Sequence, residues 1–153
     1  MKIAFACDHG GFELKRELIS HAEARGCECV DFGYDGGAKR VDYPEYGYLA
    51  AKAVRDGECD LGVLVCGTGV GMSLTANKMK GIRAVVCSEP FTAKLSRQHN
   101  DSNVLALGGR VVGPDLAKMI LDSWLDATFE GGRHAERIGM VMEIDETGEL
   151  RDR

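Results

Sequence analysis

Residues 61–73 read Leu61-Gly62-Val63-Leu64-Val65-Cys66-Gly67-Thr68-Gly69-Val70-Gly71-Met72-Ser73, which predicts a buried strand, a glycine turn and a helix. The apolar run before Cys66 is typical of a strand covered on both faces. Glycines at three alternate positions let the backbone turn sharply and approach a ligand with no Cβ in the way. The helix expected from about Val70 directs free N–H groups into the turn, which suits an anion or a developing oxyanion. The Cys66 thiol, the Thr68 hydroxyl and these amides therefore converge on one small volume.

Three familiar motifs are disfavoured at this turn. A dinucleotide-binding fingerprint requires glycine at the position that Met72 occupies, and a cysteine-dependent phosphatase loop requires arginine there. A P-loop would end in Gly-Lys-Ser or Gly-Lys-Thr, and no such run follows. The turn is therefore expected to bind a different small polar ligand.

Composition narrows the class of protein. The 153 residues fit a single domain spanning 1–153, and the net charge of −5 argues against general nucleic-acid binding. No apolar run approaches the ~20 residues that cross a bilayer, so no membrane association is expected. The N-terminal residues lack the pattern of a signal peptide, so we expect a cytoplasmic protein whose six cysteines are reduced.

Strand-like and helix-like segments alternate along the chain. Strands are expected at Lys2–Cys7, Cys27–Phe32, Leu61–Val65, Ile82–Cys87 and Asn103–Leu107. Helices are expected at about Phe12–Arg25, Tyr43–Arg55, Val70–Met79, Pro90–Asp101, Pro114–Leu125 and Arg133–Glu146, with a glycine-rich loop from Gly33 to Val41. This alternation predicts an α/β fold: a three-layer α/β/α Rossmann-like sandwich with a five-stranded parallel sheet and a projecting C-terminal helix.

In such sheets ligands bind beyond the carboxyl ends of the strands. The segments Asp8-His9, Cys66-Gly67-Thr68 and Gly109-Arg110 all follow strand ends and should meet there. His99 and Asn100 precede the fifth strand, so they reach this edge only if their loop folds back or another subunit supplies them. The last helix has an apolar stripe with no further strand to cover, and we expect it to pack on a partner chain.

These residues resemble those of the type B ribose-5-phosphate isomerases, a group that includes allose-6-phosphate and galactose-6-phosphate isomerases. The matching stretches span nearly the whole chain: Ala6–His9, Asp42-Tyr43-Pro44, Cys66–Gly71, Ala76-Asn77-Lys78, Gly81–Ala84, Ser88-Glu89-Pro90, Leu95–Asp101 and Glu130–His134. The resemblance implies a homodimer, with a dimer of dimers as the alternative, and active sites at the subunit interface. It also implies interconversion of ribose 5-phosphate and ribulose 5-phosphate with no metal and no cofactor.

The resemblance also implies a role for each matching residue. Cys66 is the base that abstracts the proton, His99 is the acid that opens the sugar ring, and Thr68 and Asp8 complete the catalytic set. Part of the family has instead a glutamate base on the glycine-loop helix, where this chain has Met72 and Ser73. The residues implied to bind the sugar phosphate are Asp8, His9, Gly67, Thr68, Gly69, Val70, Gly71, Asn100, Arg110, Arg133 and Arg137.

The chemistry agrees with these roles, although each residue has a structural alternative. A thiol near a helix N-terminus ionises more readily, and arginines one helical turn apart, at 133 and 137, suit a phosphate. However, Cys66 could be an inert buried thiol, and His99 could simply interact favourably with the dipole at a helix C-terminus. The two arginines could pair with nearby glutamates. A metal site from Asp8, His9 and His99 lacks paired-ligand spacing.

Two other functions remain open. The first is the same reaction on a hexose 6-phosphate, which the loop from Tyr34 to Val41 and the volume of the site would decide. The second is a non-catalytic sugar-phosphate sensor, which would have no need for Cys66, Thr68 and His99 together.

Overall fold

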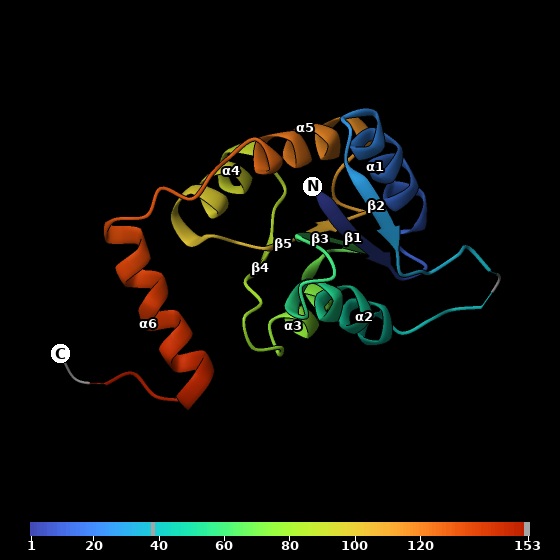
Figure 1. The fold of residues 1–153 in the computed structure, drawn as a ribbon. Helices are drawn as coiled ribbons and strands as arrows, with labels where there is room; N and C mark the ends of the chain where they lie inside the picture. The colour runs from blue at the N-terminus through green and yellow to red at the C-terminus, as the bar shows by residue number, and fades with distance from the viewer. Residues whose placement is uncertain (38, 152–153) are drawn as a thin grey trace.

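The computed structural model describes residues 1–37 and 39–151, and within them strands and helices alternate as expected (Figure 1). The strands are β1 (Lys2–Cys7), β2 (Glu28–Asp31), β3 (Leu61–Cys66), β4 (Ala84–Val86) and β5 (Val104–Gly108). The helices are α1 (Phe12–Ala24), α2 (Tyr43–Arg55), α3 (Val70–Ala76), α4 (Pro90–Asn100), α5 (Pro114–Leu125) and α6 (Arg133–Thr147). Residue 38, in the expected loop from 33 to 41, lies outside the described residues.

The strands form one sheet in the order β2-β1-β3-β5-β4, and every pair is parallel. The direction in which successive strands are added to the sheet reverses between β1 and β3. The chain adds β2 on one side of β1 and then returns to add β3 on the other side of β1. Cys7 pairs with Val65, and Cys66 pairs with Gly108. The segments that follow β1, β3 and β5 therefore emerge side by side, at the point where open α/β sheets bind their ligands.

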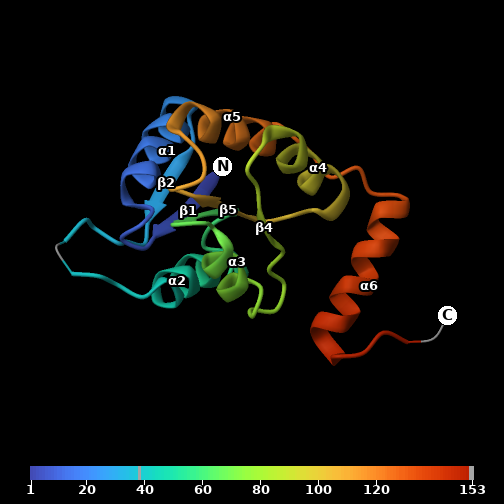
Figure 2. The same cartoon turned by 180° about the vertical axis from the view of Figure 1, so that it is seen from behind.

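Helices cover both faces of the sheet, which confirms the three-layer prediction. Figures 1 and 2 show α1, α4 and α5 on one face and α2 and α3 on the other. The first layer buries Leu18, Ile120 and Trp124 against β1, β3 and β5. The second packs small residues such as Ala50 and Ala76 against the opposite face. Burial on both faces explains the continuous apolar run at residues 61–66.

The largest differences from the expected bounds are the shorter β4 and α3. β4 spans Ala84–Val86 rather than residues 82–87, and the N–H of Arg83 donates to the Asn103 side chain instead of to a strand. α3 ends at Ala76 rather than Met79. The Asn77 side chain, directly after α3, bonds both the N–H and the carbonyl of Ala84.

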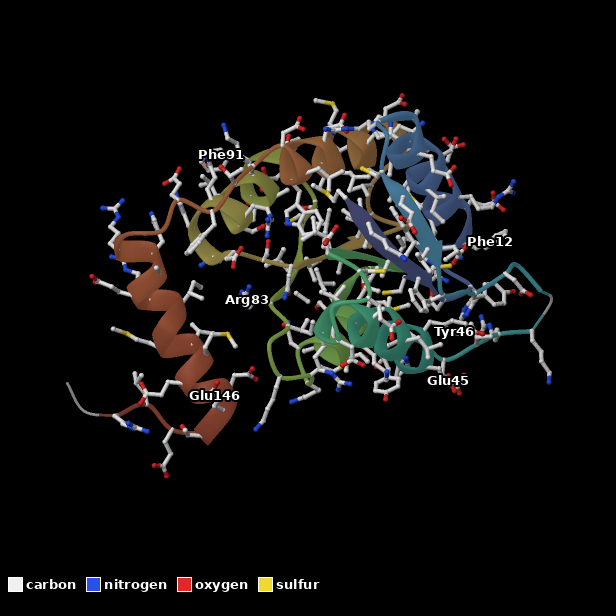
Figure 3. The ribbon with its side chains drawn as sticks, viewed as in Figure 1. Phe12, Glu45, Tyr46, Arg83, Phe91 and Glu146 are labelled. Carbon is white, nitrogen blue, oxygen red and sulfur yellow. The ribbon has the colours of Figure 1, made fainter. Side chains whose placement is uncertain are left out.

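The last helix, α6, projects from the body of the molecule next to the end of α4 (Figures 1 and 2). Its one buried residue is His134, whereas Val141 and Ile144 remain 49% and 45% exposed. A groove of about 460 Å³ separates its apolar side from the residues around β4, including Ile82 and Val85. Figure 3 shows Arg83 in this space, and its guanidinium lies 3.6 Å from the Met142 sulfur.

Among the described residues, no helix combines the length and the apolar character needed to span a bilayer. The six cysteines are all free, as expected from the sequence.

Candidate active site

The Cys66 thiol lies at the carboxyl end of β3 and is almost completely buried, at 4% exposed. The backbone N–H of Gly69 donates a hydrogen bond to its sulfur at 3.1 Å. Gly69 can turn back in this way because its φ is +82°, a left-handed conformation that residues with a Cβ rarely adopt. The fixed N–H therefore holds the Cys66 sulfur in one position against the glycine loop.

The end of β1 lies directly against this loop. The Asp8 carboxylate is 8% exposed and accepts a hydrogen bond from the N–H of Gly10 at 2.8 Å. A Cβ added to Gly10 would lie 3.1 Å from the backbone nitrogen of Gly67. The two backbones can therefore approach this closely because position 10 has no side chain. Asp8 and Cys66 are brought to the same edge, as the strand order requires.

The end of β5 forms a third side of the site. The N–H of Gly109 donates to the Cys66 carbonyl at 2.8 Å, and the N–H of Arg110 donates to the Gly67 carbonyl at 3.1 Å. The Arg110 side chain lies over Gly67, because a Cβ there would be 3.6 Å from its Cδ, Nε and Cζ. The guanidinium, the carboxylate of Asp8 and the thiol thus surround the glycine loop.

The remaining loop residues take the expected places. The Thr68 hydroxyl accepts a long hydrogen bond, 3.4 Å, from the N–H of Val70, whose side chain is half exposed at the start of α3. Ring nitrogen Nδ1 of His9 lies 3.3 Å from the carbonyl of Val41, so His9 connects β1 to the loop before α2. Gly71 lies in the first turn of α3.

The sequence leaves open whether Tyr43 contacts the substrate, and the structure places its ring against Gly71. A Cβ on Gly71 would lie 2.8 Å from the Tyr43 ring, which therefore covers the first turn of α3. The sequence signal was its position in the matching stretch Asp42-Tyr43-Pro44, directly before the proline that begins α2.

The other predicted residues lie at the opposite ends of the strands, where β5 begins. His99 and Asn100 end α4 and precede β5, whereas Cys66 is in register with the last residue of β5. A strand of five residues spans about 16 Å at roughly 3.3 Å per residue. The loop after α4 does not fold back, because Asn103 already bonds the start of β3. Arg133 and Arg137, on α6, lie beside the end of α4 and not beside the thiol.

At this second edge His99 and His134 stack face to face, with ring centroids 4.2 Å apart and planes within 2°. Nε2 of each ring lies 3.8 Å from the same carboxylate oxygen of Glu130. The three side chains have enough ligand atoms for a metal ion, all within 4.8 Å of one another. However, a metal lies in the plane of each imidazole that binds it, and no single position lies in two parallel planes. The cluster as arranged is not a metal centre.

A backbone hydrogen bond, and not burial, distinguishes Cys66 from the buried cysteines Cys7 and Cys87. Burial raises the pKa of Cys7 and of Cys87 to about 11, so both stay neutral thiols at physiological pH. The Cys7 sulfur points instead to the Tyr34 carbonyl, which is 3.7 Å away. Among these three strand-end cysteines, Cys66 alone has a backbone N–H donor aimed at its sulfur in the described structure.

Comparison with known proteins shows the family. Residues 3–141 match the model of the Ribose/Galactose Isomerase family. The chain belongs to this family. Ribose-5-phosphate isomerase B of Escherichia coli is 58% identical over 145 residues, which cover 95% of this chain and 97% of the relative.

Solved structures are also similar to this chain. Ribose-5-phosphate isomerase B of Clostridium thermocellum superposes with a TM-score of 0.94 at 53% identity and covers 97% of this chain and 100% of its own. The Mycoplasma genitalium enzyme with bound ribulose 5-phosphate has a TM-score of 0.91 at 39% identity, covering 95% and 97%. This likeness confirms the resemblance found in the sequence motifs.

Proposed function

We propose that the protein is an aldose–ketose isomerase that interconverts D-ribose 5-phosphate and D-ribulose 5-phosphate in the pentose phosphate pathway. The observation that carries the proposal is the Cys66 sulfur, which accepts the Gly69 N–H in a glycine loop beside Asp8 and Arg110. Family membership and relatives named ribose-5-phosphate isomerase B support the choice of substrate.

The reaction begins with ring opening. The C1–O4 bond of the furanose breaks, O4 takes a proton from His99, and the anomeric hydroxyl loses its proton as the C1 carbonyl forms. Histidine suits this step because it both gives and takes a proton near neutral pH.

The Cys66 thiolate then removes the proton from C2, and O1 is protonated to give the enediol. Return of the proton to C1, with loss of the O2 proton, gives the ketose, so the step needs no external oxidant or reductant. The Thr68 hydroxyl and the loop amides that are not already bonded to Cys66 or Thr68 stabilise the oxygens on which negative charge develops. Asp8 accepts the hydroxyl hydrogens of the open-chain sugar.

We propose that the active unit is a homodimer in which His99, Asn100, Arg133 and Arg137 of one subunit complete the site of the other. The support is geometric, because within one chain these residues lie at the edge of the sheet opposite to Cys66. Apolar side chains are also exposed around the thiol loop: Val70, Val86 and Val111 are 40–57% exposed. Monomers rarely leave such patches uncovered.

The phosphate is anchored by guanidinium groups in this arrangement. Arg133 and Arg137 are one helical turn apart on α6 and come from the partner, whereas Arg110 and His9 come from the subunit that supplies the thiol. The protein acts in the cytoplasm, where reducing conditions keep the free Cys66 thiol available.

Steady-state isomerisation of ribose 5-phosphate, measured beside allose 6-phosphate and galactose 6-phosphate in the presence of EDTA, tests this function. We expect the largest kcat/KM for ribose 5-phosphate, undiminished by the chelator. A larger kcat/KM for a hexose 6-phosphate would reassign the substrate. No turnover of any of the three would support a sugar-phosphate sensor instead.

A further inference from the structure

We propose that Glu130 is a positioning residue for His99: its carboxylate, together with the stacked ring of His134, holds the His99 imidazole in the orientation that ring opening requires. This inference rests on the proposed function and adds to it a residue that does not touch the substrate.

Backbone hydrogen bonds fix the place of Glu130. Its N–H donates to the carbonyl of Gln98 at 2.9 Å, which ties the segment between α5 and α6 to the last turn of α4. Gly131 and Gly132 follow with φ of +65° and +54°, so the chain reverses at once into α6. The N–H of His134 then donates to the carbonyl of Gly131 at 3.0 Å. These bonds set the carboxylate opposite the two imidazoles.

The carboxylate and the second ring constrain His99 in different directions. The 3.8 Å separation between Nε2 of His99 and Oε2 of Glu130 directs one edge of the ring at the carboxylate. The stack on His134 fixes the plane of the ring. A side chain that is 35% exposed at a helix end would otherwise sample several rotamers. Two independent restraints leave one orientation.

The charges around the pair assign the roles of the two rings. Burial, the nearby His99 and Arg133 lower the pKa of His134, whereas Glu130 acts in the opposite direction. The net effect favours the neutral form of His134, which serves as a flat support for the other ring. Arg137 adds a further positive charge on the α6 side. Glu130 is therefore the anion that faces Nε2 of His99.

A test must separate ring opening from proton transfer at carbon. Ribose 5-phosphate is a closed furanose and must be opened before it can react. Ribulose 5-phosphate cannot form the corresponding ring, because its O5 carries the phosphate. Exchange of the C1 hydrogen of ribulose 5-phosphate with deuterium from D₂O needs the thiolate and the enediol but no ring opening. Nuclear magnetic resonance measures this exchange directly.

In Glu130→Gln, which keeps the size of the side chain, we expect kcat for ribose 5-phosphate to fall about tenfold, less than the roughly 10²-fold cost of a 1 Å misplacement. KM and the exchange rate of ribulose 5-phosphate should stay within about twofold of the wild type. Glu130→Asp keeps the negative charge but moves it one methylene further from His99. It should also slow the reaction of ribose 5-phosphate and leave the exchange of ribulose 5-phosphate unchanged. The matched control is Glu136→Gln, an exposed glutamate on the first turn of α6, which should change neither rate.

Dependence on His99 completes the test. In a His99→Asn background, Glu130→Gln should cause no further loss, because the residue to be positioned is gone. The inference is overturned if Glu130→Gln leaves the ribose reaction unchanged, or if it slows ring opening and hydrogen exchange equally, as general damage to the fold would. It is also overturned if the two substitutions are additive. Failure of the proposed function is a different result, in which the wild type does not isomerise ribose 5-phosphate.

Discussion

The backbone N–H of Gly69 points at the sulfur of Cys66, three residues earlier, at a distance of 3.1 Å. The loop therefore wraps around the side chain that precedes it, and the donor is part of the backbone and cannot rotate away. This contact gives one of the six cysteines a fixed backbone donor at its sulfur, whereas burial raises the pKa of Cys7 and of Cys87 to about 11.

Removal of the thiol tests its role as the base. In Cys66→Ala we expect kcat to fall on the order of 10³-fold, within the range of general base catalysis, while ribulose 5-phosphate still binds. Isomerase assays and calorimetric titration measure the two quantities. Cys87→Ala is the matched control, since it removes another buried strand-end thiol that stays neutral, and its kcat should not change. A wild-type kcat in Cys66→Ala would show that the base lies elsewhere.

A side chain at position 69 should break the contact with the thiol. Gly69→Ala meets two obstacles: a φ of +82° and a Cβ only 3.1 Å from the backbone of Leu107. Gly81→Ala is a control with the same φ but open space around the new Cβ. Both should lower the free energy of unfolding by about 1 kcal/mol or more. Only Gly69→Ala should lower kcat. Denaturant titrations measure the stability of the two variants, and isomerase assays measure their kcat. Equal losses of kcat would contradict a role of the Gly69 N–H in the function of Cys66.

The division of labour between acid and base is testable at His99. In His99→Asn we expect a much larger loss of kcat on cyclic ribose 5-phosphate than on hydrogen exchange at C1 of open-chain ribulose 5-phosphate. The reason is that His99 serves the ring oxygen, whereas the carbon proton is moved by Cys66. The two rates are measured on the same preparation. Equal losses would mean that His99 takes part in the enediol step.

Mixing of inactive chains tests the shared site. Cys66→Ala and Arg137→Ala homodimers should both be inactive, but a heterodimer has one site with an intact thiol from one chain and an intact arginine from the other. We therefore expect about half of the wild-type turnover per heterodimer if both sites act independently. Co-refolding, separation by different affinity tags and assay of the purified heterodimer measure this recovery. A verified heterodimer without activity would show that Arg137 serves its own subunit.

The buried thiols predict how stability depends on alkaline pH. The pKa of Cys7 and of Cys87 is about 11 in the folded chain, above the ordinary value of 9.0. The stability that the two neutral thiols contribute to the folded chain is therefore fully present below pH 9 and is lost as pH rises toward 11. The reason is that these thiols ionise in that window only in the unfolded chain. Each thiol should account for on the order of 1–2 kcal/mol. Urea titrations at pH 8, 9 and 10 should show a smaller decline in Cys87→Ala than in the wild type; an identical decline would contradict the shift.

Local patterns in the sequence predicted the elements that carry the site. The apolar run before Cys66, the three glycines after it and the proline or glycine at most helix ends depend on neighbouring residues alone. The convergence of residues 8, 66 and 110 was also predictable, because parallel strands bring their carboxyl ends to one edge. The structure confirms this placement.

Other features depend on contacts between distant segments, which periodicity does not encode. The sequence left open whether the loop after His99 folds back, and the bond from Gly62 to the Asn103 carbonyl keeps it at the far edge. The stack of His99 on His134 joins two helices separated by α5 and a turn, and Glu130 enters it only because its N–H reaches the end of α4. Sequence alone therefore determined the strands, the thiol and its glycine loop, since these follow from local backbone geometry. Tertiary packing alone decided at which end of the strands His99, His134 and Glu130 lie.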